Sequence, residues 1–220
     1  MVCKVGHRGA AGYAPENTLQ SFQKALELGV DMIEFDVYVL KSGELAVIHD
    51  DTVDRTTKGK GKVEEKTLSE LKELGIPTIE EVLDLADKKA DINIELKGGN
   101  TAEPVSRVIE KYVEEKGWEY DDFFVSSFNH SELKKFKNLS PKVKIGVLTE
   151  EIPEGFIDFS EKIDAHSVNV PVKEATQGFV DQAHMRGLKV YVWTANEPEE
   201  IEKSKSLNVD YICSNYPDKI

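Results

Sequence analysis

Several features are scarce or absent in this sequence of 220 residues. Only two cysteines are present, Cys3 and Cys213, too few for a disulfide framework, and neither has the C-x-x-C spacing of a zinc site. No apolar run approaches the roughly 18 to 20 residues of a membrane-spanning helix, and the first residues lack the apolar stretch of a secretory signal. These absences predict a cytoplasmic protein with reduced thiols and no stable membrane insertion.

Positive charge is also in short supply. The chain carries 28 lysines and arginines against 41 aspartates and glutamates, which gives a formal net charge of -13 at pH 7. Such a chain repels the phosphates of nucleic acids, so no nucleic-acid partner is expected. The hydrophobic content of 40% can fill a sizeable core, and the length favours one large domain, residues 1–220. The oligomeric state stays open.

What the sequence does contain is a regular alternation of short β-branched runs with amphipathic stretches, which is typical of βα units around a parallel sheet. Eight runs have the character of strands: Val2–Gly6, Met32–Leu40, Asp91–Leu96, Phe123–Phe128, Val143–Leu148, His166–Val170, Lys189–Trp193 and Tyr211–Cys213. Eight strands favour a closed (β/α)8 TIM barrel. Because the chain ends seven residues after Cys213, the eighth helix is predicted to be missing or vestigial.

The connections between these runs carry helix and turn signals. Three pairs of polar residues have the spacing of a capping box: Asn17 with Gln20, Thr78 with Glu81, and Asn129 with Glu132. After the second strand, residues 41–44 predict a turn into a further apolar run, Leu45–His49. Residues 51–75 are rich in Lys, Gly, Thr and Glu, and we expect them to form a small insertion before the second barrel helix.

Three carboxylates occur in two neighbouring predicted strands. Glu34 and Asp36 are two residues apart, as are Glu95 and Lys97, so each pair points to one face of its strand. Functional residues of TIM barrels lie at the carboxyl ends of the strands. Clustered carboxylates repel one another, and a divalent cation explains them better than a purely structural network with Lys97 and Arg8. Oxygen ligands suit Mg²⁺ or Ca²⁺, and the sequence does not choose between them.

Two histidines are predicted at the same rim. His7 and Arg8 end the first strand, and His49 returns from the turn after the second, followed by Asp50, which is expected to orient His49 or a turn. Arg8 and Lys97 beside a cation form an anion site, for which phosphate is the best fit. His7 and His49 can then serve as general base and general acid, in an order the sequence leaves open, because imidazole titrates near neutrality.

A set of short motifs follows in a defined order along the chain: Gly6-His7-Arg8-Gly9, Pro15-Glu16-Asn17-Thr18, Glu34-Phe35-Asp36-Val37, His49-Asp50, Asp54-Arg55-Thr56-Thr57 with Gly59 and Gly61, Ile94-Glu95-Leu96-Lys97 and Val192-Trp193-Thr194. Each motif alone is weak, but the ordered set resembles the glycerophosphodiester phosphodiesterase family. The resemblance extends from the first strand to Ser214-Asn215-Tyr216-Pro217, where the family more often has Thr-Asp in place of Ser214-Asn215.

This resemblance implies a TIM barrel with a small insertion after the second strand and the metal-dependent hydrolysis of glycerophosphodiesters to glycerol 3-phosphate and an alcohol. The positions that match the family's site fall into three groups. Its metal ligands match Glu34, Asp36 and Glu95, its acid–base pair matches His7 and His49, and its phosphate contacts match Arg8 and Lys97. The attacking group is either a water molecule at the cation or the substrate's own 2-hydroxyl.

Other residues and other functions compete with this interpretation. Trp193 is expected either to pack on the glycerol moiety or to belong to the core, Glu16 to pair with Arg8, and Asn17 to cap a helix; Asn169 stays open. A lysophospholipase-D-like activity would use the same chemistry but needs an apolar groove or interfacial helix. A catalytically silent phosphodiester-binding protein would tend to lack one of the histidines or carboxylates. A Schiff-base aldolase using Lys97 would leave the histidines and acids without a task.

Overall fold

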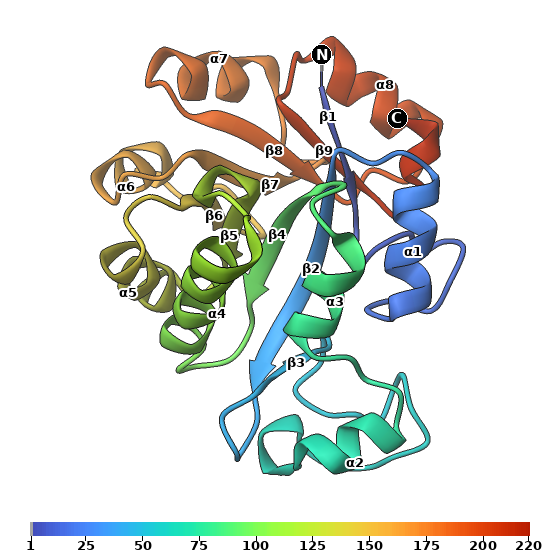
Figure 1. Cartoon of the computed structure of the whole chain (residues 1–220). Coiled ribbons are helices and arrows are strands. Elements are labelled where there is room, and N and C mark those ends of the chain that lie inside the picture. The colour runs from blue at the N-terminus through green and yellow to red at the C-terminus, as the bar shows by residue number, and fades with distance from the viewer. Residues whose placement is uncertain (1) are drawn as a thin grey trace.

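The computed structural model describes residues 2–220, and its centre is a closed ring of parallel strands (Figure 1). Around the ring, the strands follow the order β1 (Cys3–Gly6), β9 (Tyr211–Ser214), β8 (Lys189–Trp193), β7 (Ser167–Pro171), β6 (Lys144–Leu148), β5 (Phe123–Ser127), β4 (Asp91–Leu96) and β2 (Met32–Val39). Pairing of β1 with β2 closes the ring. Every strand lies within one residue of its predicted ends, and the predicted TIM barrel is confirmed.

Helices cover the outside of the ring and connect successive strands. They are α1 (Leu19–Glu27), α3 (Ile79–Ala86), α4 (Ala102–Lys116), α5 (His130–Leu139), α6 (Phe156–Lys162), α7 (Gln177–Met185) and α8 (Pro198–Ser206), and a 3₁₀ turn, η2 (Tyr120–Asp122), precedes β5. After β9, residues 215–220 contain one 3₁₀ turn, η3 (Pro217–Lys219). Within residues 2–220, no helix combines the length and the apolar character that crossing a bilayer requires.

Alternation along β2 explains how the barrel separates its core from its site. Ile33, Phe35 and Val37 are fully buried in the core between the strands and the helices. Side chains alternate between the two faces of a strand, so Glu34 and Asp36 point to the barrel interior. In the parallel pairing with β4, Glu34 lies opposite Asn93 and Asp36 lies opposite Glu95. This register brings the three carboxylates together near the carboxyl ends of the two strands.

The interior below the carboxylates combines apolar side chains with a few buried polar ones, such as Asn93 and Ser126. The apolar side chains form a separate buried cluster, namely Val5, Met32, Phe124, Tyr191 and Cys213. Val5 of β1 pairs with Cys213 of β9, so Cys3 lies two residues away from the position opposite Cys213. A stagger of two residues is about 6–7 Å along the strands, and neighbouring strands lie about 4.8 Å apart, so the two Cα atoms are about 8 Å apart, beyond the roughly 7 Å limit for a disulfide. Both thiols are free, as predicted.

The predicted insertion projects beyond the end to which β2 points, at the bottom of Figure 1. A hairpin leads into it, since β3 (Leu45–Val47) pairs antiparallel with β2, and the insertion itself, residues 51–75, contains a 3₁₀ turn, η1 (Val63–Glu65), and a short helix, α2 (Leu68–Glu73). Val53, Val63 and Leu71 of the insertion share a small buried core with Leu40, Ala46, Ile48 and Ile76 of the adjoining segments. The insertion is therefore an ordered unit that delivers the residues after β3 to the rim of the barrel.

The predicted capping boxes have different outcomes. At α3 the box is confirmed: the Thr78 hydroxyl accepts from the Glu81 backbone N–H, and the Glu81 carboxylate accepts from the Thr78 N–H. At α5 only half of it forms. Asn129 caps the Glu132 N–H, but the Glu132 carboxylate accepts instead from the backbone of α4.

The prediction that Asn17 caps the first helix was wrong. Thr18 is the N-cap of α1, and its hydroxyl accepts from the Ser21 N–H at 3.2 Å. Asn17 has a left-handed backbone, φ 56°, and its side chain turns inward, where Nδ2 donates to the Asp36 carboxylate at 2.9 Å. Both residues can cap a helix, and the buried carboxylate of Asp36 decides between them because its lone pairs need a donor.

Candidate active site

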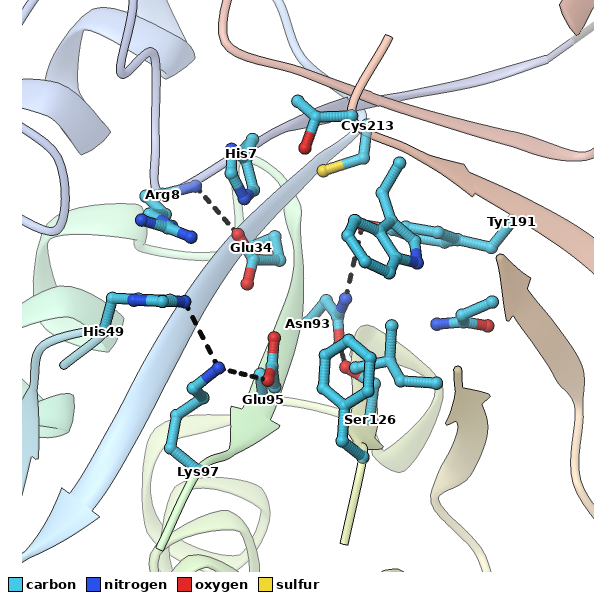
Figure 2. A pocket seen from close by; sticks show the side chains of 15 residues that line it. His7, Arg8, Glu34, His49, Asn93, Glu95, Lys97, Ser126, Tyr191 and Cys213 are labelled. Atoms are coloured by element: carbon cyan, nitrogen blue, oxygen red, sulfur yellow. Dashed lines mark hydrogen bonds and ion pairs between the residues drawn. The ribbon is translucent and has the colours of Figure 1, made fainter. Parts of the chain in front are cut away.

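A pocket opens at the carboxyl ends of the strands (Figure 2). The predicted site residues that line it are His7, Arg8, Glu34, His49, Glu95, Lys97 and Trp193. Asp36 is only 1% exposed and reaches the others by contact, since its carboxylate lies 3.5 Å from Arg8 Nε and 3.8 Å from Lys97 Nζ. The structure therefore brings together every residue that the sequence placed in the site.

The turn after β1 depends on a glycine. Gly9 has φ 85°, and a Cβ there would lie 2.5 Å from the Ser21 hydroxyl oxygen. This close approach lets Ser21 Oγ donate to the Arg8 carbonyl at 2.9 Å, which fixes the turn against α1. The Arg8 backbone N–H then donates to Glu34 Oε2 at 2.8 Å. Arg8 is thus held at the carboxylate cluster by its main chain, and its guanidinium is left to face the pocket rim.

Glu34, Asp36 and Glu95 form a compact acidic cluster. Each offers a carboxylate oxygen, and these three atoms lie within 4.8 Å of one another. Burial, followed by repulsion from Asp36 and Glu95, raises the pKa of Glu34 well above its ordinary value. Burial and the charge of Asp36 likewise raise the pKa of Glu95 to about 7. The cluster therefore resists full ionisation unless positive charge is added.

The acidic cluster fits a divalent cation. Its donors are all oxygens, which hard cations such as Mg²⁺ and Ca²⁺ prefer. A further acceptor, Asn17 Oδ1, is buried nearby and finds no hydrogen-bond partner among residues 2–220. A buried acceptor without a partner is unfavourable, and a cation beside Asp36 would satisfy it. The three carboxylates are compatible with a metal site on both grounds.

His7 is held in one orientation from the opposite end of the chain. Its Nδ1 lies 2.7 Å from Asn215 Oδ1, and the Asn215 backbone N–H donates to Asn196 Oδ1 at 2.9 Å. Burial, then the charge of Arg8, lowers the pKa of His7 to about 4. The imidazole is therefore neutral at pH 7, and because Nδ1 donates to Asn215, Nε2 is free to accept a proton.

His49 has a different environment. Its Nδ1 lies 2.7 Å from Asp50 Oδ1, in the orienting contact that the sequence predicted as one of two roles for Asp50, and its Nε2 lies 3.3 Å from Lys97 Nζ. Lys97 also donates to Glu95 Oε1 at 2.9 Å. Burial lowers the pKa of Lys97, but the charges of Glu95 and Asp36 more than compensate and leave it raised. A charged Lys97 is unsuited to Schiff-base chemistry, which argues against the aldolase alternative.

One wall of the pocket is aromatic. Trp193 packs edge-on against Phe128, with ring centroids 5.5 Å apart, and Leu148 also lines the pocket. The Lys97 ammonium lies 5.6 Å from the centroid of the Phe128 ring, so this wall borders the charged groups. Between this wall and the acids, Ser126 Oγ donates to Asn93 Oδ1 at 3.0 Å in the buried floor. The pocket thus offers charge to one end of a ligand and aromatic surface to the other.

The sequence interpretation missed or misassigned the roles of some residues at the site. Asn215 and Arg55 occur in the recognised motifs without a task, and Asn17 had a different one. Asn169, whose role the sequence left open, is fully buried and lines the pocket. The motifs did contain a signal for these roles, because a buried polar residue that does not cap a helix or form a turn needs another hydrogen-bond partner.

Comparison with known proteins agrees with this geometry. The model of the Glycerophosphoryl diester phosphodiesterase family matches residues 7–219. A glycerophosphodiester phosphodiesterase of Caldanaerobacter subterraneus subsp. tengcongensis is 35% identical, over 98% of this chain and 95% of the relative.

Solved structures are similar over nearly the whole chain. A phosphodiesterase of Oleispira antarctica, in complex with the product sn-glycerol-3-phosphate, has a TM-score of 0.89 at 28% identity and covers 98% of this chain and 94% of its own. The glycerophosphodiester phosphodiesterase of Thermotoga maritima has a TM-score of 0.82 at 30% identity and covers 99% and 96%. With its closed barrel and its acidic, two-histidine pocket, this chain belongs to the glycerophosphoryl diester phosphodiesterase family.

Proposed function

We propose that this protein is a divalent-cation-dependent glycerophosphodiester phosphodiesterase, which hydrolyses glycerophosphodiesters to glycerol 3-phosphate and an alcohol. The observation that carries the proposal is the meeting, in one pocket, of a three-carboxylate cluster, two histidines and two fixed cationic side chains (Figure 2). Sulfate or carboxylate ligands would not need both a metal and an acid–base pair. Hydrolysis of a phosphodiester can use all of these groups, because it builds negative charge and moves two protons.

Glu34, Asp36 and Glu95 are the residues that would hold the cation. A bound Mg²⁺ or Ca²⁺ supplies positive charge next to the phosphate oxygens and offsets the repulsion among the three carboxylates. Arg8 and Lys97 supply the remaining positive charge from the protein itself. Both are kept ionised by the neighbouring acids, and both are held in place by their contacts with those acids.

The different surroundings of the two histidines support different roles. His7 is neutral and presents a free Nε2, so it would take the proton of the attacking hydroxyl. His49 is paired with the Asp50 carboxylate, which compensates the positive charge of a protonated imidazole. His49 would therefore give its proton to the leaving alcohol as the phosphorus–oxygen bond breaks. Water or the 2-hydroxyl of the glycerol moiety is the attacking group.

The aromatic wall supports a position for the rest of the substrate. Trp193 and Phe128 present ring surface beside the charged end of the pocket. The carbon skeleton of a glycerol moiety can pack on such a surface while its phosphate faces Arg8 and Lys97.

The test is an assay of choline or ethanolamine release from glycerophosphocholine, glycerophosphoethanolamine and a choline lysophospholipid, with glycerol 3-phosphate as the second product of the two deacylated diesters. The assay is run with EDTA and after readdition of Mg²⁺ or Ca²⁺. We expect release from the two water-soluble diesters that stops in EDTA and returns with the cation. Turnover confined to the lysophospholipid would indicate the lysophospholipase-D-like alternative. Binding of the diesters without any release would indicate the catalytically silent alternative, and undiminished release in EDTA would contradict metal dependence.

A further inference from the structure

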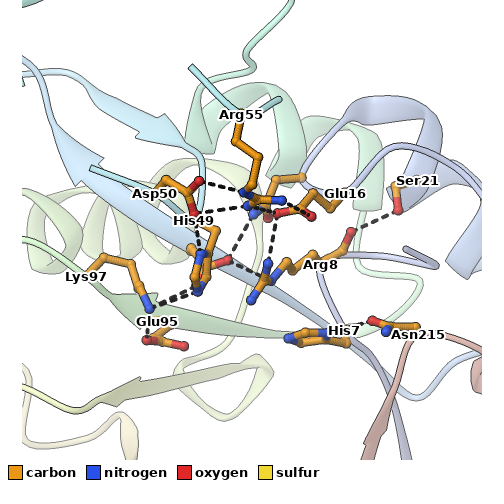
Figure 3. A network of polar contacts seen from close by, with 12 residues as sticks. His7, Arg8, Glu16, Ser21, His49, Asp50, Arg55, Glu95, Lys97 and Asn215 are labelled. Carbon is orange, nitrogen blue, oxygen red and sulfur yellow. Dashed lines mark hydrogen bonds and ion pairs between the residues drawn. The ribbon is translucent and has the colours of Figure 1, made fainter. Parts of the chain in front are cut away.

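Arg55 lies in the insertion, outside the pocket lining, yet it contacts the residues that hold two site groups (Figure 3). We propose that Arg55 is a positioning residue for the phosphodiesterase reaction, which fixes His49 and Arg8 relative to each other through Asp50 and Glu16. This inference rests on the proposed function, since it assigns a task within that same site. The insertion then helps to position the residues of the active site.

The guanidinium of Arg55 makes two double contacts. On one side Nε and Nη2 donate to the two oxygens of Asp50, at 2.6 and 3.0 Å. On the other side Nη1 and Nη2 donate to the two oxygens of Glu16, at 2.9 and 2.7 Å. A planar guanidinium has donors in a fixed fork that matches carboxylates in this way, and a lysine ammonium does not.

Each of these carboxylates also holds a group of the site. Asp50 Oδ1 contacts His49 Nδ1 at 2.7 Å, and Glu16 Oε1 accepts from Arg8 Nη1 at 2.8 Å. Arg55 is thus one residue removed from the proposed proton donor and one residue removed from a proposed phosphate contact. The hydrogen bonds from Arg55 are the largest influence that lowers the pKa of Glu16 to about 2 and holds the pKa of Asp50 well below its usual range. Both carboxylates therefore stay ionised and keep their contacts with His49 and Arg8.

The packing around this bridge leaves the ion pairs to set the geometry. The insertion folds around the small core that it shares with the adjoining segments, while the loop before α1 belongs to the barrel. Between them lies a hollow lined by both units, including Pro15 and Asn17 from the loop and Thr57 and Leu74 from the insertion. Close apolar packing does not fill this hollow. Glu16 also lines it, and the ion pair of Glu16 with Arg55 joins the loop that follows Arg8 to the insertion that follows His49.

The bridge is better suited to fixing geometry than to stabilising the fold. The Arg55 side chain is 48% exposed, and exposed ion pairs contribute little to the free energy of unfolding. A protein with a tilted His49 ring would still fold normally, but the ring would present its proton poorly to the leaving group. Loss of a residue that orients a site group typically lowers activity by about 10- to 100-fold. We therefore expect a loss in kcat with a nearly unchanged melting temperature.

The experiment compares Arg55→Gln and Arg55→Lys with wild type in steady-state assays on glycerophosphocholine at saturating cation. The matched control is Arg107→Gln, which removes an exposed helix ion pair with Glu103 on the outside of α4. Arg55→Gln should lower kcat by about 10- to 100-fold with a melting temperature within about 2 °C of wild type. Arg55→Lys should recover only part of the rate, and Arg107→Gln should keep wild-type kinetics.

Two further measurements separate positioning from general damage. Combining Arg55→Gln with Asp50→Asn should lower kcat by clearly less than the product of the two single losses, because both changes disturb His49, although Arg55→Gln also releases Glu16. The ¹⁵N NMR signals of the His49 ring, identified with a His49→Gln variant, should shift in Arg55→Gln and not in the Arg107 control. These ring signals report on the bridge even if the wild-type protein does not release glycerol 3-phosphate, a result that would count against the proposed function instead. A kcat within about 3-fold of wild type, additive losses in the double variant, or unchanged ring signals would overturn the assignment of Arg55.

Discussion

Replacing Glu95 by glutamine should stabilise the cation-free protein at neutral and alkaline pH, although it removes a proposed metal ligand. The reason lies in the acidic cluster. The pKa of Glu95 rises from 4.5 to about 7 in the folded protein, because of burial and then the charge of Asp36. Glutamine is a neutral substitute for the protonated carboxyl, and its amide oxygen can still accept from Lys97.

The magnitude follows from linkage. Between pH 4.5 and 7 the folded protein holds a proton on Glu95 that the unfolded chain has released, so the wild-type free energy of unfolding falls as the pH rises. Each unit of pKa difference corresponds to about 1.4 kcal/mol, which gives about 3 kcal/mol over the whole window. For a chain of this length, such a difference corresponds to a melting temperature higher by about 6–12 °C in the variant at pH 8.

The assay is thermal or urea unfolding of wild type and Glu95→Gln from pH 5 to pH 8, in EDTA and in excess Mg²⁺ or Ca²⁺. The difference between the two proteins is the quantity to follow, because His7 titrates in the opposite direction. Its pKa falls from 6.5 to about 4 on folding, so its contribution to stability increases as the pH rises through that window. His7 is common to both proteins and cancels. Glu110→Gln, at an exposed position of α4, is the matched control for the loss of one negative charge.

A bound cation should reduce the advantage of the variant. At a concentration 100 times its dissociation constant, a ligand adds about 2.7 kcal/mol to the stability of the protein that binds it, and Glu95→Gln should gain less because it lacks one carboxylate. The advantage of the variant should therefore shrink or change sign in excess cation. A variant less stable than wild type in EDTA at pH 8, or a difference that does not change with pH, would refute the account of the cluster.

The remaining predictions concern the reaction and the thiols. His7→Ala and His49→Ala should each lose about 10²-fold or more in kcat while circular dichroism shows the fold intact, and a variant with near-normal turnover would remove that histidine from the acid–base pair. If the substrate's 2-hydroxyl attacks, a 2-deoxy analogue should lose kcat far more than KM, and ³¹P NMR should detect a transient cyclic phosphate; equal rates for both substrates would instead favour water. Titration with a thiol reagent should count two free groups, Cys3 and Cys213, in the unfolded chain, while Cys213 in the folded protein should react slowly because burial raises its pKa.

Much of this protein was determined by local patterns in its sequence. Strand runs such as Asp91–Leu96 and helix starts such as Thr78 could be read directly, because alternation of burial and capping depend on residues a few positions apart. The spacing of Glu34 and Asp36 also fixed their common face, since successive side chains of a strand alternate. The rule that barrel sites lie at the carboxyl ends of strands then placed the carboxylates and histidines in one pocket.

Other features were decided only by the tertiary structure. The cap of α1 passed from Asn17 to Thr18 because a buried carboxylate, Asp36, lies where only the fold can bring it. His7 is oriented by a residue 208 positions further along the chain, and Arg55 reaches Glu16 across 39 positions. The local preferences of residues carry no information about such partners, because residues far apart in the sequence come together only when the whole chain folds. The sequence thus specified which groups the site contains, and the closed barrel decided which of them hold one another in place.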